Sequence, residues 1–398
     1  MWVGMRKALL VCILMISMSM LGIIPNEFSS DSSDPVLTEA QEEVLYTHSS
    51  TSHWEYDSSA GGGWGDWASA IALDSDGNAY ITGSFVSPII EFGNIVLNNS
   101  GVMPSLGMNN SSYSNYDFDV FVAKLDPMGN WVWAIKADGF GVEDAYGIAV
   151  DQSGFVYVTG DFSPISDGNG GQIGPSFGQN QLTSAGNYDG FVARVSPGGQ
   201  WLWALSYGSI CIDSIRDIDV GSNGDVYFTG LVGFAGDDGC GAGMLGGSGD
   251  NAIIGKLNPA APYGQILWVV ESDCAGCHAP GPGYVPVYDR GNGVSVDDNG
   301  NAFITGIKNR NTTFGGLGAN SSAASYKDGF TAKIDATGSV EWVNHGKGGN
   351  DVVVGPGSVY VVGNGQYGVG WVQSLDEQNG NWQWTSETGC GSQSAGTP

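Results

Sequence analysis

A thirteen-residue pattern that recurs along this chain constrains its fold more than any other feature. The pattern reads Ile-Ala-Leu-Asp-Ser-Asp-Gly-Asn-Ala-Tyr-Ile-Thr-Gly at 71–83 and returns at 148–160, 218–230, 294–306 and, in reduced form, 352–363. The glycine that closes each copy lies 77, 70, 76 and then 57 residues after the previous one. A period of this length indicates one supersecondary unit that packs against copies of itself.

Each copy holds four short strand patterns and no helical periodicity. We expect a Trp strand such as 131–134 to come first in a copy, followed by two apolar runs around an Asp-x-x-Gly turn and by a last strand such as 121–126. Four strands per unit with turn residues between them are typical of a β-propeller. The sequence therefore predicts an all-β protein, a β-propeller of about five recognisable units over 51–390. A β-solenoid is the alternative, and its repeats are much shorter than these.

The hairpin and the last strand carry a resemblance to a known family. Asp-x-x-Gly-Asn-x-Tyr-x-Thr-Gly at Asp74–Gly83, its Phe variant at Asp297–Gly306, and Phe-Val-Ala-Lys-Leu-Asp at 121–126 resemble the prokaryotic SBBP β-propeller repeats, over about 54–385. The resemblance implies seven blades and no enzymatic activity. Five copies and a surplus Trp382–Trp384 strand leave two alternatives: this strand closes the ring, or it opens a sixth copy of a truncated six- or seven-bladed ring.

The two ends of the chain differ from the repeats in composition. Residues 1–25 join Arg6 and Lys7 to an apolar run, which predicts a signal peptide or an N-terminal anchor. Residues 26–50 read as an acidic Ser-rich linker and 391–398 as a tail. The net charge of −28 argues against nucleic acid as a partner, and we expect membrane contact only through an uncleaved N-terminal segment. The expected location is secreted or cell surface.

The cysteines offer two chemistries. Cys274-Ala-Gly-Cys277-His278 satisfies the spacing for covalent attachment of a c-type haem, with His278 as the axial ligand. The Gly- and Pro-rich residues that follow His278 do not continue a helix, so we favour disulfide bonds over haem, and zinc or free thiols remain as alternatives. The disulfide candidates all lie in long loops of the units: Cys211, Cys240, Cys274, Cys277 and Cys390.

A carboxylate also recurs shortly before the repeated pattern, at Asp66, Asp144, Asp213 and Asp289. Oxygen ligands from several units would suit calcium, but we favour turn caps that accept hydrogen bonds from nearby backbone amides. Asn-x-Ser/Thr acceptors for glycosylation begin at five positions in the variable stretches: Asn98, Asn109, Asn110, Asn311 and Asn320.

The functional expectation is a binding or scaffold module. Its long Gly/Asn/Ser loops would present a surface to a protein or glycan partner, with no catalytic activity and no resident cofactor. The first alternative is an extracellular redox protein, either quinoprotein-like or haem-bearing through Cys274, Cys277 and His278. The second is a hydrolase or lyase, for which the four scattered His residues supply no evident acid or base.

Overall fold

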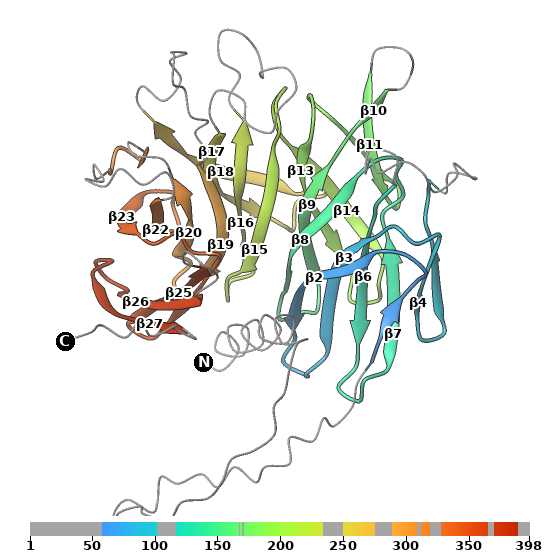
Figure 1. The fold of residues 1–398 in the computed structure, drawn as a ribbon, viewed down its shortest axis with the longest axis horizontal. Helices are drawn as coiled ribbons and strands as arrows, with labels where there is room; N and C mark the ends of the chain where they lie inside the picture. The colour runs from blue at the N-terminus through green and yellow to red at the C-terminus, as the bar shows by residue number, and fades with distance from the viewer. Residues whose placement is uncertain are drawn as a thin grey trace, which may run out of the picture.

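The computed structural model describes residues 58–101, 117–166, 168, 171–233, 250–274, 289–308, 312–318, 328–364 and 370–388. All regular structure in this part of the chain is β-strand, arranged chiefly as four sheets of four antiparallel strands and one sheet of five around a common centre (Figure 1). No helix of the described residues is long and apolar enough to cross a membrane. The all-β propeller prediction is confirmed.

The five sheets, numbered as blades in chain order, have the following strands from the centre outward. Blade 1 holds β2 (Asp66–Leu73), β3 (Ala79–Phe85), β6 (Asp119–Leu125) and β7 (Trp131–Lys136). Blade 2 holds β8 (Glu143–Val150), β9 (Val156–Phe162), β13 (Asp189–Val195) and β14 (Trp201–Tyr207). Blade 3 holds β15 (Ser214–Val220), β16 (Val226–Gly233), β17 (Asp250–Asn258) and β18 (Gln265–Cys274). Blade 4 holds β19 (Arg290–Val296), β20 (Ala302–Lys308), β22 (Asp328–Ile334) and β23 (Val340–Gly346). Blade 5 holds β24 (Asp351–Gly355), β25 (Ser358–Asn364), β26 (Gly370–Asp376) and β27 (Trp382–Thr388).

The sheet pairing corrects the expected place of the Trp strands. Each Trp strand ends a blade rather than beginning one, because it pairs with the Lys-containing strand before it, as β7 does with β6. The turn between these two strands is only Asp126–Asn130, and such a short connection favours pairing of its two neighbours. The Trp382–Trp384 strand is therefore the outer strand of blade 5 and not the first strand of a sixth copy.

The repeated pattern forms the hairpin of the two inner strands, as predicted. In blade 1, Asp74 Oδ1 accepts hydrogen bonds from the backbone N–H groups of Asp76 and Asn78 (3.0 and 2.9 Å), and Gly77 adopts a φ of 84°. A positive φ is open to glycine at little cost, which explains the fixed Asp-x-x-Gly spacing. Asp74 and Asp76 thus belong to the turn of the hairpin, as the sequence predicts.

Apolar side chains pack between consecutive blades. Four core clusters join blades 1 and 2, 2 and 3, 3 and 4, and 4 and 5, each from the facing sides of two sheets. A fifth cluster lies on the other side of blade 1 and includes Phe92 and Phe121. Among the described residues, no core cluster joins blade 5 to blade 1.

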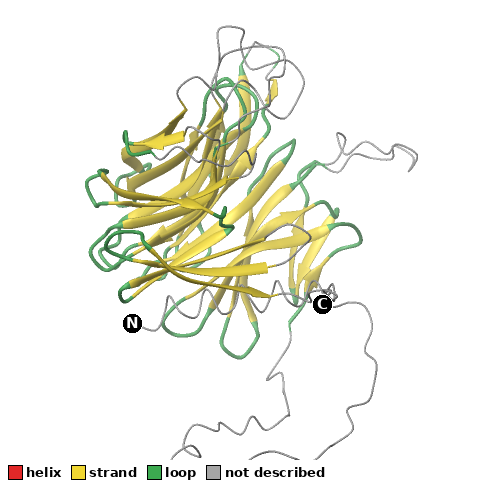
Figure 2. Cartoon of the chain, turned by 60° about the vertical axis from the view of Figure 1, so that its left-hand side comes forward, coloured by secondary structure: helices red, strands yellow, loops and turns green. Residues whose placement is uncertain are grey.

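Short strands between the second and third strands of a blade add small sheets at its edge (Figure 2). In blade 1, β4 (Ile89–Phe92) pairs with both β5 (Ile95–Asn98) and β1 (Ala60–Gly61). The corresponding strands of blade 2 are β10 (Ile165–Ser166), β11 (Gln172–Phe177) and β12 (Asn180–Thr183). In blade 4, β21 (Thr312–Phe314) pairs with β18 of blade 3.

Candidate functional site at the axis of blades 2 and 3

The connections that vary in length emerge from one edge of the blades. Because neighbouring strands are antiparallel, the links from second to third strand and from fourth strand to the next blade leave at the same edge, which we call the variable face. The short Asp-x-x-Gly turns lie at the opposite edge. Loops that differ in length and composition on a fixed scaffold are where propellers and other repeat folds carry function.

The innermost strands of blades 1 to 4 share an irregularity close to the variable face. In each, one residue is inserted between pairs of the hairpin register, for example between Ala145 and Gly147 of β8. Such a bulge re-aims a side chain and often lies beside a functional site. The inserted residues are all polar and all different: Ser69, Tyr146, Arg216 and Asn292.

Two of these inserted residues contact each other across the blade boundary. The Arg216 guanidinium carbon lies 4.2 Å from the centre of the Tyr146 ring, a cation–π geometry. The Tyr146 hydroxyl donates to Asp161 Oδ1 at 3.4 Å, at the end of β9. Arg216 Nε and Asp144 Oδ1 are buried, and neither has a hydrogen-bond partner in the described part of the chain. A donor and an acceptor thus remain free in one cluster of Asp144, Tyr146, Asp161 and Arg216, which we call the axial cluster.

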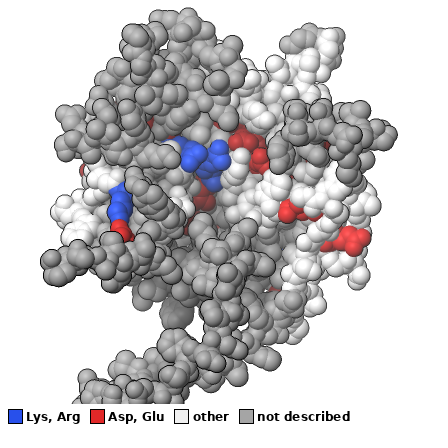
Figure 3. Space-filling model, viewed as in Figure 1, with Lys and Arg blue, Asp and Glu red and all other residues white. Residues whose placement is uncertain are grey.

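Burial controls the ionisation of the axial cluster. It raises the pKa of Asp161 to about 6, and the positive charge of Arg216 and the Ser214 hydroxyl offset this only in part. Burial also raises the pKa of Asp144, against the Ser84 hydroxyl and Arg216. Figure 3 shows basic and acidic side chains of the described residues side by side on this face of the molecule. Perturbed carboxyls beside an arginine are a common property of functional sites.

A second group of carboxyls lies between blades 1 and 2. Asp119 pairs with Lys136 Nζ at 3.0 Å, and burial raises the pKa of Asp119. Burial raises the pKa of Glu143 well above its usual value, and the charges of Asp119 and Asp117 add to the effect. Asp117 has a pKa raised to about 6 by burial, which its hydrogen bond from the Gly141 amide opposes. In the described ranges, no group of three or more His, Cys, Asp or Glu side chains is arranged to hold a metal ion.

Comparison with known proteins agrees with this architecture. A profile of the SBBP family, described as a beta-propeller repeat, matches residues 60–84 and 143–161, which hold the inner hairpins of blades 1 and 2. This chain carries SBBP β-propeller repeats. An uncharacterized WD repeat-containing protein of Acanthamoeba polyphaga mimivirus is 30% identical over 129 residues, which are 32% of this chain and 8% of that protein. The chain therefore spans a small part of that relative's length.

Solved structures similar to this SBBP-repeat chain are distant. A protein of unknown function from Bacteroides caccae is 9% identical, with 82% of this chain and 83% of that chain covered and a TM-score of 0.33. A Synechocystis apocarotenoid oxygenase variant is 10% identical, with coverage of 80% and 61% and a TM-score of 0.38. A rhamnogalacturonan lyase of Bacillus licheniformis is 14% identical, with coverage of 82% and 50% and a TM-score of 0.31.

The carboxylates that recur before the repeated pattern cap loops in two blades, as favoured above. Asp66 accepts from the amides of Gly62, Val86 and Ser87 at 2.7 to 3.2 Å. Asp213 accepts from the Gly233 amide at 2.7 Å, and burial raises its pKa to about 6.

In blades 2 and 4 the carboxylates depart from this backbone-capping pattern. Asp289 accepts from the hydroxyls of Ser272 (3.2 Å) and Thr312 (2.7 Å). Asp144 is offset by one position: Glu143 pairs with Phe162 as Asp66 pairs with Phe85, so Glu143 is the equivalent residue. Asp144 lies instead in the axial cluster.

The cysteine and glycosylation candidates fall mostly outside the described residues. Cys211 is disulfide-bonded. Cys274 ends β18. The rest of the haem pattern, Cys277 and His278, lies outside the described ranges, as do Cys240 and Cys390. Asn98 is exposed at the end of β5. The other four acceptors, Asn109, Asn110, Asn311 and Asn320, lie outside the described part, as do residues 1–57 and 389–398.

Sequence reasoning missed Tyr146, Asp161 and Arg216. A usable signal exists for Arg216, because it is one of only 13 basic residues and lies just before a repeated hairpin pattern. The bulge that brings Arg216 to Tyr146 leaves no mark in the sequence, since it depends on the strand register.

Proposed function

We propose that this protein is a secreted or cell-surface binding module, without catalytic activity, whose axial cluster holds a hydroxyl-rich ligand such as a glycan. The observation that carries the proposal is the pair of unpartnered polar atoms, Arg216 Nε and Asp144 Oδ1. A buried donor and a buried acceptor without partners are costly to the fold, by about 1–3 kcal/mol each, and a ligand that fills both removes the cost.

The chemistry of the cluster suits sugar hydroxyls. A hydroxyl group both donates and accepts, so adjacent hydroxyls of one sugar can accept from the Arg216 guanidinium and donate to the Asp144 carboxylate. The Arg216 charge is held in place by the Tyr146 ring rather than by an ion pair within 4 Å in the described structure. A guanidinium that is oriented by a ring and whose Nε donates to no protein group can receive a ligand oxygen without breaking an existing hydrogen bond.

We expect a glycan microarray probed with the full chain to identify a polysaccharide ligand, and Arg216→Gln and Asp144→Asn each to weaken its binding about tenfold by isothermal titration calorimetry. Each substitution removes one charge-assisted hydrogen bond to the ligand, and circular dichroism verifies that each variant keeps its fold. Lys347→Gln is the matched control: Lys347 is a half-exposed cation that pairs with Glu387 in blade 5. Equal binding by the native chain and both axial variants would reject the proposed site.

A further inference from the structure

The same hydrogen bond recurs at the four boundaries between consecutive blades, from blade 1 to blade 5. The indole N–H of a Trp on the outer strand donates to a backbone carbonyl in the outer turn of the next blade. The four pairs are Trp133 to Pro197 at 3.1 Å, Trp203 to Pro259 at 3.3 Å, Trp268 to Ala336 at 3.3 Å and Trp342 to Glu377 at 3.1 Å. We call this contact the Trp lock.

A glycine of the receiving turn completes each lock by packing on the indole. A Cβ added at Gly199 would meet the Trp133 ring at 2.8 Å, and one added at Gly380 would meet the Trp342 ring at 2.4 Å. These glycines have φ values of 78° and 68°, which also favours glycine. The receiving turn therefore needs a glycine both for its backbone and for the flat surface that it offers to the ring.

Blade 5 carries the donating half of a fifth lock. Trp384 pairs with Ser374 on β26 as Trp342 pairs with Lys333 on β22, and its ring lies 6.2 Å from that of Tyr360. Trp384 is 45% exposed, whereas Trp203 is 2% exposed. Its indole N–H has no acceptor among the described residues. Ser374 stands opposite Trp384 where the other blades carry a basic residue, so the Trp384 ring would make the main contact with a neighbouring blade.

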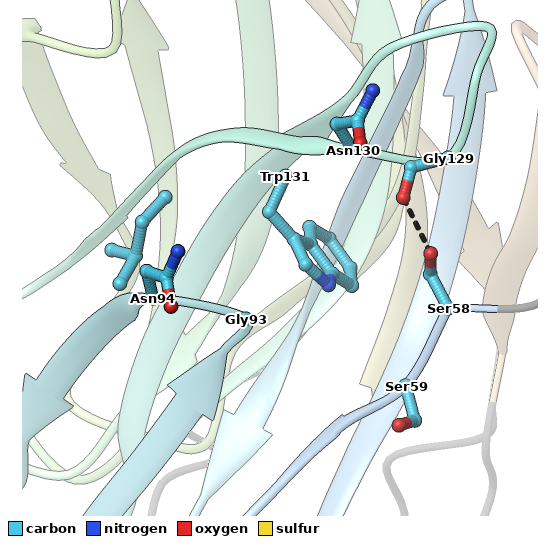
Figure 4. A pocket seen from close by; sticks show the side chains of 8 residues that line it. Ser58, Ser59, Gly93, Asn94, Gly129, Asn130 and Trp131 are labelled. Atoms are coloured by element: carbon cyan, nitrogen blue, oxygen red, sulfur yellow. Dashed lines mark hydrogen bonds between the residues drawn. The ribbon is translucent and has the colours of Figure 1, made fainter.

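Blade 1 carries the receiving half. Its outer turn is Asp126–Asn130, with Gly129 at a φ of 82°, so Pro127 supplies the carbonyl equivalent to that of Pro197. A cavity of about 390 Å³ opens beside this turn and is lined by Ser58, Ser59, Gly93, Asn94, Ile95, Gly129, Asn130 and Trp131. Figure 4 shows the Trp131 ring between Gly93 and Asn94 on one side and Ser58 and Ser59 on the other, with the Ser58 hydroxyl donating to the Gly129 carbonyl of the turn.

We propose that blade 5 of one copy of this chain locks onto blade 1 of a second copy, with Trp384 donating to the Pro127 carbonyl. Both halves of the interface are on this chain, and four internal boundaries show that the two halves fit. The two faces are different surfaces, so the association is head to tail rather than two-fold symmetric. Exposed aromatic rings of this kind are the usual anchors of protein interfaces.

Sedimentation of the full chain tests the proposal. The native protein is expected to show reversible, concentration-dependent association between about 1 and 100 µM, and Trp384→Ala to raise its dissociation constant about tenfold. Ser59→Trp, an exposed position on the cavity wall, should weaken association by filling the receiving face. Trp382→Ala is the matched control, because the Trp382 indole donates within its own strand, to Thr385 at 2.8 Å.

Mixing the variants separates the lock from any other contact. Trp384→Ala retains an intact blade 1 face and Ser59→Trp an intact blade 5 face, so an equimolar mixture should form a heterodimer more tightly than either variant associates alone. Circular dichroism of each variant verifies the fold. A native chain that stays monomeric up to about 100 µM, or a mixture that fails to associate, would overturn the proposal.

Discussion

Trp203→Ala is expected to lower the free energy of unfolding by about 3–5 kcal/mol, the usual cost of removing a large buried aromatic side chain. Trp203 is 2% exposed and lies in the core between blades 2 and 3. The substitution removes its ring contact with Tyr157, its hydrogen bond to Pro259 and its packing on Gly264. Urea unfolding followed by circular dichroism measures the loss as a lower transition midpoint.

The repeat supplies a matched control for this experiment. Trp384 occupies the same place in blade 5 and is 45% exposed, so Trp384→Ala should cost about 1 kcal/mol or less in the monomer. Protein at a concentration well below the dissociation constant of the proposed association avoids a contribution from the second copy. If Trp203→Ala and Trp384→Ala lowered the midpoint equally, the boundary between blades 2 and 3 would not depend on the Trp lock.

The sequence was sufficient to predict the elements that the copies share. The Asp74–Gly83 hairpin, the Lys-containing strand and the Trp strand have fixed spacings because turn geometry and packing between blades require the same residues in every copy. The grouping of strands into blades was harder, since Trp131 follows one strand and precedes the next hairpin, and both groupings fit the spacing. The short Asp126–Asn130 turn decides between the two groupings, because it favours pairing of the Lys-containing strand with the Trp strand that follows it.

The candidate site could be predicted only in part. The sequence pattern assigns Asp144 to the recurring carboxylate position, yet the structure places Glu143 at that position and Asp144 beside Arg216. The sequence cannot reveal this, because a one-residue bulge changes which side chains share a face. Tyr146 and Arg216 meet across two blades, and such a contact depends on the whole ring rather than on either local pattern.

Burial of the Asp161 carboxylate in the axial cluster lowers the free energy of unfolding near neutral pH. Asp161 is 6% exposed and its ionised form is destabilised by burial. Packing alone would be better served by an uncharged residue at this position. Retention of an ionisable group that weakens the fold near neutral pH is typical of a site that serves binding rather than stability.

We expect Asp161→Asn to remove a loss of stability that the native protein undergoes as pH rises from about 4 to about 7. The pKa of Asp161 is raised from 3.8 to about 6 in the folded protein. Between pH 3.8 and about 6, Asp161 keeps its proton in the folded chain and has released it in the unfolded chain. Its contribution to stability is therefore complete below the unfolded pKa and is lost as pH rises through the folded pKa, by about 3 kcal/mol in all.

Urea midpoints of the native and variant chains, measured at intervals over this pH range, test the expectation. The variant should gain stability relative to the native protein as pH rises, while a smaller slope remains because Asp117 and Asp213 also have pKa values raised to about 6. Asp126→Asn is the control: hydrogen bonds from Asn130 lower the pKa of Asp126, so it is ionised in both states above about pH 4 and its removal should leave the slope unchanged. Parallel native and Asp161→Asn curves would show that burial does not hold a proton on Asp161, and the electrostatic basis of the axial cluster would then be wrong.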